Sequence, residues 1–134
     1  MTTPGFSITE IIQAAHKLKL VYDAFFDKYE NAESRVRELS HAIDVFHFNL
    51  INHEWILQRS GRHYPGHGAF RRTLEECDEF IKEYRSLLDK KAPRTQKAWK
   101  TTCWPFEEGH VNRLIRQLNT HVQAMAGFTL NLLL

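Results

Sequence analysis

The chain has few of the residues that crosslink or interrupt a fold. Its 134 residues include two cysteines, four prolines and six glycines. Cys77 and Cys103 are too few to form the disulfide framework of a small secreted domain. We therefore expect a reduced, cytoplasmic compartment in which both thiols are buried.

Long apolar runs and a strong charge of one sign are lacking too. There is no stretch of about 18 apolar residues, as a membrane-spanning helix would need, and residues 1–6 have neither region of a signal peptide. The net formal charge of +2 differs from the strongly basic balance of most nucleic-acid-binding proteins. Apolar residues make up 43% of the chain, which is enough for a core. We therefore expect one domain over residues 1–134.

Helical periodicity is clear in the first half of the chain. Ser7-x-x-Glu10 is a capping-box pattern that predicts a helix over residues 8–29, with Phe6 packed against Ile11 as a hydrophobic staple. Asn31 is a good N-cap for a second helix, which Gly61 would end. That helix carries a heptad seam of Val36, Leu39, Ile43, Phe46, Leu50, His53 and Leu57. Val45, Phe48 and Trp55 widen its apolar face and predict contact with more than one neighbour.

Two more helices are predicted after a loop at residues 63–68. The third has an apolar seam and ends before Pro93. Pro105 opens the fourth, with Glu107 in its first turn. Residues 96–103 are predicted to form a short extra helix. Because the connections are short, we expect an all-α, up-down-up-down four-helix bundle with the extra helix between helices three and four. The seam of the third helix consists of Phe70, Leu74, Cys77, Ile81, Tyr84 and Leu88.

The histidines do not form a metal-binding pattern. His41, His47 and His53 are six residues apart, so each is rotated by about 240° from the last on a helix. His63 and His67 flank Pro65-Gly66 and share no helix face. We expect no metal or cofactor, and we interpret His53 as a core histidine with satisfied hydrogen bonds.

No pattern of catalytic residues is apparent either. Cys77 lies on an apolar seam beside acidic residues, which would raise the pKa of its thiol and make it a poor nucleophile. The chain also has no Ser/His/Asp order and no G-x-x-x-x-G-K-[ST] loop for nucleotide phosphates. We therefore predict that the chain is not an enzyme.

Two charged surfaces are candidates for binding. A basic segment beside tryptophans suits an anionic membrane, although it could also be a solvated linker whose tryptophans cover the end of the bundle. An acidic face on the third helix could meet this segment on the next copy and build a ring or filament. Without a recognition helix, the segment predicts no specific nucleic-acid binding. The basic segment consists of Lys90, Lys91, Arg94, Lys97, Trp99 and Lys100, and the acidic face of Glu75, Glu76, Glu79 and Glu83.

Four short motifs follow one another along the chain. They are G-F-S-I-T-E-I-I at residues 5–12, E-L-S-H-A-I at 38–43, E-C-D-E-F-I at 76–81, and the tryptophan-flanked segment 99–104 with Glu107 and Glu108 after it. In this order they resemble the helical N-terminal domains of fungal STAND proteins, which are NLR-like receptors with a nucleotide-binding domain further along. The histidine-rich loop at 63–67 is unlike that of the family.

The resemblance implies a role in signalling rather than a reaction. It predicts a HeLo-like four-helix bundle that acts as the N-terminal effector module of a larger receptor in programmed cell death or incompatibility. The partners it implies are further copies of the chain, an anionic membrane upon activation, and the receptor's C-terminal nucleotide-binding domain. The alternative is a homotypic oligomerisation bundle with no membrane activity.

Overall fold

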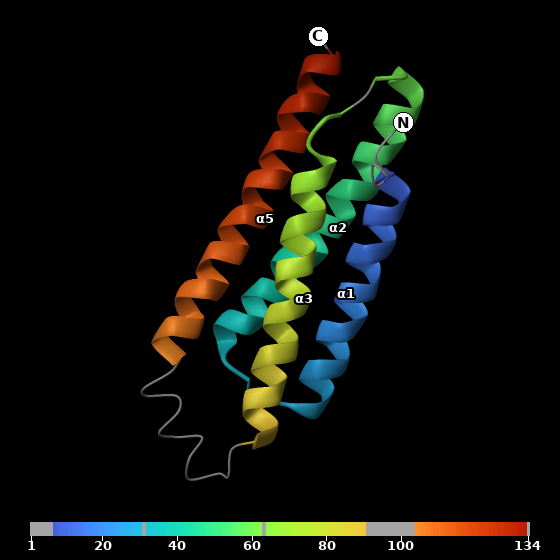
Figure 1. Cartoon of the computed structure of the whole chain (residues 1–134). Coiled ribbons are helices and arrows are strands. Elements are labelled where there is room, and N and C mark those ends of the chain that lie inside the picture. Colours follow the sequence, from blue (N-terminus) through green and yellow to red (C-terminus); the bar gives the residue numbers. More distant parts are fainter. Residues whose placement is uncertain (1–6, 31, 63, 91–103, 134) are drawn as a thin grey trace.

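Over the residues that the structure describes, four helices run antiparallel in sequence order (Figure 1). The computed structural model describes residues 7–30, 32–62, 64–90 and 104–133. Within them lie α1 (Ile8–Lys28), α2 (Ser34–Ser60), α3 (His67–Lys90) and α5 (Trp104–Leu133). The predicted all-α, up-down-up-down four-helix bundle is confirmed. The predicted short extra helix at residues 96–103 lies outside the described residues.

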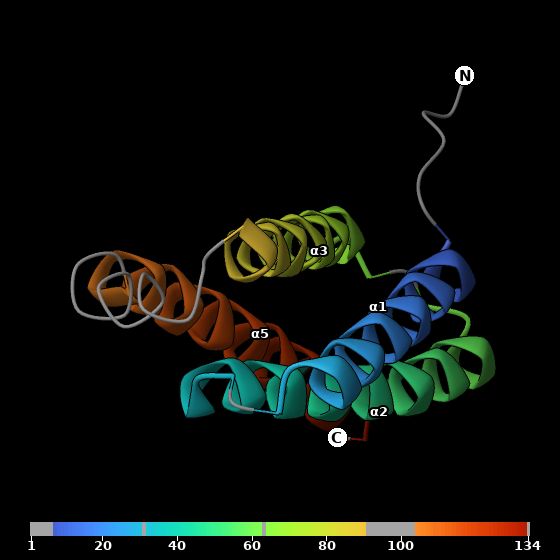
Figure 2. The ribbon, with the colours of Figure 1, turned by 90° about the horizontal axis from the view of Figure 1, so that it is seen from below.

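The helices do not contact one another equally. α2 packs most extensively on α5 and then on α1, whereas α3 contacts α1 and, least of all, α5. The view along the bundle shows α3 on the opposite side of the molecule from α2 (Figure 2). One long face of α2 therefore points away from the other three helices. Over the described residues, no helix is long and apolar enough to cross a membrane.

The ends of the first two helices show which of the predicted capping residues cap a helix. The Ser7 hydroxyl accepts a hydrogen bond from the Glu10 backbone N–H at 3.2 Å, as the capping-box pattern predicts. Gly61 ends α2 in the left-handed conformation, with φ of 66°. The predicted N-cap at Asn31 is wrong, because α2 begins at Ser34 with Glu33 in the cap position. There the Glu33 backbone N–H donates to the Tyr84 hydroxyl at 3.3 Å, so the start of the helix is bound to α3.

The predicted seams form the core. All seven seam residues of α2 are buried, and so are those of α3 except Leu88, which is half-buried. From α5, the core takes Val111, Leu114, Leu118 and Met125. The Tyr22 hydroxyl of α1 donates to the Cys77 carbonyl oxygen of α3 at 2.9 Å, so this buried polar group has a partner.

Two expectations about α2 and the loop are wrong. Val45, Phe48 and Trp55, which were expected to contact further helices, are exposed. They lie on the opposite side of α2 from the buried seam, through which this helix packs on its neighbours. His67 and Gly68 belong to the first turn of α3 rather than to the loop.

Candidate functional site

An apolar strip runs along the outer face of α2. It consists of Phe48, Trp55, Ile51 and Val45, which are 66%, 57%, 45% and 36% exposed. We call these four residues the α2 strip. The other large hydrophobic side chains that the described residues expose, namely Leu20, Val21 and Leu130, lie on α1 and α5. The α2 strip is therefore the place where exposed apolar side chains recur on one helix face.

Three residues of the α2 strip, Val45, Phe48 and Trp55, lie on a second heptad seam, and Ile51 lies beside it. His41, Val45, Phe48, Asn52, Trp55 and Arg59 alternate steps of four and three residues. All six are exposed, and they face away from the core seam of the same helix. Such spacing is what a helix presents to another helix in a left-handed pair.

Neighbouring helices cover the flanks of α2 but not this outer seam. On the α1 side, the Lys19 ammonium lies 3.8 Å from the Asp44 carboxylate, and the rings of His16 and His47 are 5.6 Å apart. On the α5 side, Arg35 donates a hydrogen bond to Asn112. The α2 strip therefore stays open to solvent among the described residues.

A cation–π contact orders one end of the α2 strip. The guanidinium carbon of Arg59 lies 3.9 Å from the centre of the Trp55 ring, a distance at which the cation and the ring face attract each other. This contact holds the indole against the helix surface. It also places a positive charge beyond one end of the α2 strip, whereas the negative charge of Asp44 lies at the other end.

The acidic face predicted on α3 is partly neutralised within the chain. Glu75 pairs with Arg71 at 3.1 Å, and the half-buried Glu76 pairs with Arg113 of α5 at 3.4 Å. Glu79 and Glu83 are exposed and form no ion pair with another described residue. Of the predicted basic segment, Lys90 ends α3. Its side chain lies outside the described residues, as do Lys91, Arg94, Lys97, Trp99 and Lys100.

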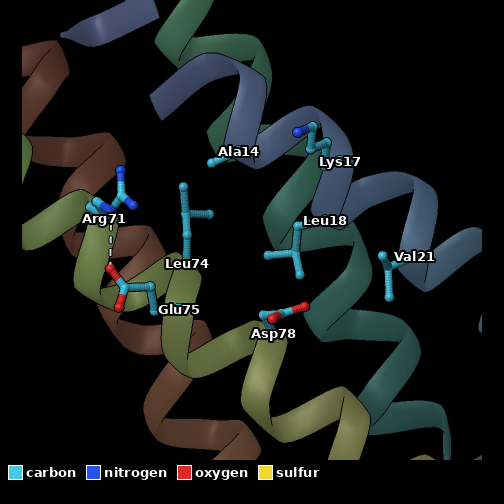
Figure 3. A pocket seen from close by; sticks show the side chains of 8 residues that line it. All are labelled: Ala14, Lys17, Leu18, Val21, Arg71, Leu74, Glu75 and Asp78. Atoms are coloured by element: carbon cyan, nitrogen blue, oxygen red, sulfur yellow. Dashed lines mark hydrogen bonds and ion pairs between the residues drawn. The ribbon is translucent and has the colours of Figure 1, made fainter. Parts of the chain in front are cut away.

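A small groove lies between α1 and α3 (Figure 3). Its volume is about 240 Å³, below the roughly 300–1,000 Å³ of typical small-molecule sites. Ala14, Leu18, Val21 and Leu74 provide its apolar wall. Among its charged residues, Glu75 is paired with Arg71 and Asp78 with Lys82 at 2.7 Å. The groove thus presents little chemistry for recognising a particular ligand.

His53 is the buried polar side chain that the core leaves without partners. It is 2% exposed, and neither ring nitrogen hydrogen-bonds to a described residue, so the interpretation of His53 as a satisfied histidine is wrong. Aromatic rings surround it, with the centre of the Tyr64 ring at 4.9 Å and that of Phe128 at 5.8 Å. Burial, and secondarily the nearby His67, lower the pKa of His53 to about 4.

His41, His47 and Cys77 form no metal-binding cluster with His53. His41 is exposed and His47 is half-buried, so these two do not converge with His53. Over the parts of the chain that the structure describes, no three His, Cys, Asp or Glu side chains are placed to hold a metal ion. Burial, followed by Glu76 and Asp78, raises the pKa of the Cys77 thiol to about 12. This confirms the direction expected from the sequence.

No family model, curated protein or solved structure matches the chain. The resemblance to fungal STAND domains therefore stays a prediction. The structure adds the α2 strip, which we did not identify as a surface from the sequence. The signal was present, because Val45, Phe48 and Trp55 lie off a seam that is already complete without them.

Proposed function

We propose that this bundle is the signalling module of a fungal NLR-like (STAND) receptor and that it acts by assembling with further copies of itself. The observation that carries the proposal is the α2 strip. Folding does not require these side chains at the surface, since the core of α2 is completed by its other face. Contiguous exposed apolar residues on a monomer typically mark a surface that binds another molecule.

A single helix face would make a weak contact between two isolated bundles. Clustering of the proteins that carry the bundle would raise its effective concentration. A larger share of the bundles would then associate through the same weak contact, without any new interaction. Weak self-association is therefore a useful property in a module that reports the clustering of its receptor. The resemblance to STAND domains favours this mode of action.

A membrane-active effector is the second candidate. The observation in its favour is the arrangement of Trp55 and Arg59, which stack at the surface and leave an aromatic ring next to a cation. Amphipathic tryptophans beside basic residues suit the interface of an anionic membrane. The basic segment predicted at residues 90–100 would add to such binding.

Light scattering and liposome flotation on the purified chain separate the two candidates. For the assembly module, we expect the average mass to rise with protein concentration and the chain not to float with vesicles. A strict monomer over the whole accessible concentration range would contradict self-assembly. Salt-sensitive flotation with dye leakage would instead support the membrane effector, above all if neutralising Lys90, Lys91, Arg94, Lys97 and Lys100 abolished both.

A further inference from the structure

We propose that the α2 strip is a two-fold dimer interface, in which α2 of one copy packs antiparallel on α2 of a second copy. The inference rests on the proposed function and deepens it, because it names the surface through which the bundle assembles. The observations behind it are the outer heptad seam of α2, the exposure of that seam, and two opposite charges, with Arg59 on the seam and Asp44 beside it on the α1 side.

The positions along α2 are symmetric about one point. Phe48 and Trp55 are equally far from the midpoint between Ile51 and Asn52. A two-fold axis at the height of this point, perpendicular to the helix and running between the two copies, would bring the two α2 helices together antiparallel. Each Phe48 would then lie at the height of the partner's Trp55, so the two rings that the α2 strip exposes meet across the interface.

The charges are symmetric about the same point. Asp44 and Arg59 are also equally far from it, so each Asp44 would face the partner's Arg59. The Asp44 side chain is 39% exposed and lies 3.8 Å from the Lys19 ammonium, which is beyond hydrogen-bond distance. Its Oδ1 atom is buried on the Lys19 side, so the Oδ2 atom is the one left to accept a hydrogen bond from a guanidinium. Arg59 can keep its planar stack on Trp55 while its edge donates.

Asn52 gives this seam a further feature of a helix pair. It is exposed and lies beside the midpoint, so it would meet the partner's Asn52 close to the two-fold axis. Asn52 is the polar seam residue between the two rings, and such an amide favours one register and orientation of paired helices, because other registers leave it opposite an apolar side chain. The pairing of Phe48, Trp55, Asp44 and Arg59 would thus be held in one register.

The charges along α2 favour a second copy over a lipid surface. A helix that lies on an anionic membrane usually has a polar face rich in lysine and arginine. Here Asp44 follows the apolar strip on one side and Arg59 on the other, so the surface is neutral overall. Anionic headgroups would repel Asp44, whereas a second antiparallel copy offers it a positive charge.

A charge-exchange experiment tests the antiparallel pairing. In Asp44→Arg, both positions are positive, and in Arg59→Asp both are negative, so each variant alone should associate at least about tenfold more weakly than wild type. When the two variants are mixed, each end of the interface regains a pair of opposite charges. At one end the two native residues face each other, and at the other end the introduced arginine faces the introduced aspartate. We therefore expect sedimentation-equilibrium analysis to find that the mixture recovers dimers, and that the double variant recovers them alone.

Apolar variants test the same surface independently of charge. We expect Trp55→Ala and Phe48→Ala each to weaken dimerisation by about tenfold or more, since buried aromatic residues dominate helix-pair interfaces. Leu20→Ala is the matched control, because Leu20 is 53% exposed but lies on α1. Circular dichroism and the melting temperature check that each variant keeps its fold.

The outcomes separate the surface from the function. Dimers that survive in the Phe48 and Trp55 variants, or a charge mixture that stays monomeric, would overturn the interface while self-assembly through another surface stands. A wild-type chain that never associates would overturn both. Flotation of monomers on anionic vesicles that depends on Phe48 and Trp55 would assign the α2 strip to lipid and would also overturn the inference.

Discussion

The two faces of α2 carry the same kind of pattern but meet different surroundings. Both are heptad seams with aromatic residues, yet the Phe46 side chain is 0% exposed and that of Phe48, two residues later, is 66% exposed. Phe46 packs edge-on to Phe70 of α3, with ring centres 5.4 Å apart, whereas no described ring packs on Phe48. The faces thus differ in their covering helices, and they differ in composition too, because the outer seam includes the polar residues His41, Asn52 and Arg59.

This difference shows what hydrophobic periodicity can and cannot establish. An apolar stripe indicates that a helix face needs a cover, and the inner seam finds one in the same chain. The apolar residues of the outer seam, Val45, Phe48 and Trp55, have no such cover among the described residues. We have argued that a second copy supplies it, and the predictions below test how different the two faces are.

Removing a ring from each face should have very different effects on folding. We expect Phe46→Ala to lower the free energy of unfolding by about 3–5 kcal/mol, because it leaves a cavity between α2, α3 and α5. Phe48→Ala should change it by no more than about 0.5 kcal/mol, since that ring is exposed. Urea denaturation followed by circular dichroism measures both.

This pair of variants should be studied at low protein concentration, so that dimer formation does not add to the stability of the wild type. If Phe48→Ala destabilised the monomer as much as Phe46→Ala, the outer ring would have a structural role and the comparison between the faces would fail.

The inner seam also contains His53, a buried side chain without hydrogen-bond partners among the described residues. We expect this residue to make the stability of the fold depend on pH. The folded pKa of His53 is about 4, compared with 6.5 for the free side chain. Between these values the unfolded chain binds more protons than the folded one, so the free energy of unfolding falls as the pH drops from 7 to 4. From this pKa difference, His53 would contribute about 3 kcal/mol of that fall.

His53→Phe isolates this contribution. The substitution keeps an aromatic ring among Tyr64, Phe70 and Phe128 but removes the titrating group. The pKa values of His47 and His121 are lowered as well, and both residues remain in the variant, so the difference between the two pH profiles reports on His53. Parallel profiles from urea denaturation at several pH values would show that His53 is not protonated on unfolding.

Tyr22 and Tyr29 allow a smaller comparison between buried and exposed contacts from α1 to α3. The Tyr22 hydroxyl is buried and donates to the Cys77 carbonyl, whereas the Tyr29 hydroxyl donates to the exposed Asp89. We expect Tyr22→Phe to cost about 1 kcal/mol, because the carbonyl cannot recover the bond from water. Tyr29→Phe should cost less than about 0.5 kcal/mol, since Asp89 stays hydrated. Equal costs in urea denaturation would contradict the argument.

The sequence allowed us to predict the fold because each core seam is regular. Val36 to Leu57 on α2 and Phe70 to Tyr84 on α3 keep steps of three and four residues, and this spacing alone specifies which face is buried. The start of α2 was missed because it depends on a distant contact. The Tyr84 hydroxyl, far along the chain, binds the Glu33 N–H, and no local capping preference contains that information.

The candidate site was harder to predict for a related reason. Val45, Phe48 and Trp55 are compatible both with a wide core face and with a second binding face, and only the positions of α1, α3 and α5 decide between them. The lack of partners at His53 likewise depends on which side chains surround it. Hydrophobic periodicity shows which sides of one helix are apolar. Which of those sides stays exposed for binding depends on where the other helices pack.

The smallest effect is expected on the acidic face of α3. Glu79→Lys with Glu83→Lys should change the free energy of unfolding by less than about 0.5 kcal/mol, because both side chains are exposed and their repulsion is weak. Glu75 and Glu76 are left unchanged, since their pairs with Arg71 and Arg113 stabilise the monomer.

An α2 dimer is closed, whereas a contact between the acidic face and the basic segment at 90–100 is open and can continue into a ring or filament. We therefore expect the dimer constant to stay within about twofold of wild type and any larger assemblies to be lost. Analytical ultracentrifugation distinguishes dimers from larger assemblies. If this variant lost its dimers although α2 is unchanged, the primary contact would lie on α3 rather than on α2.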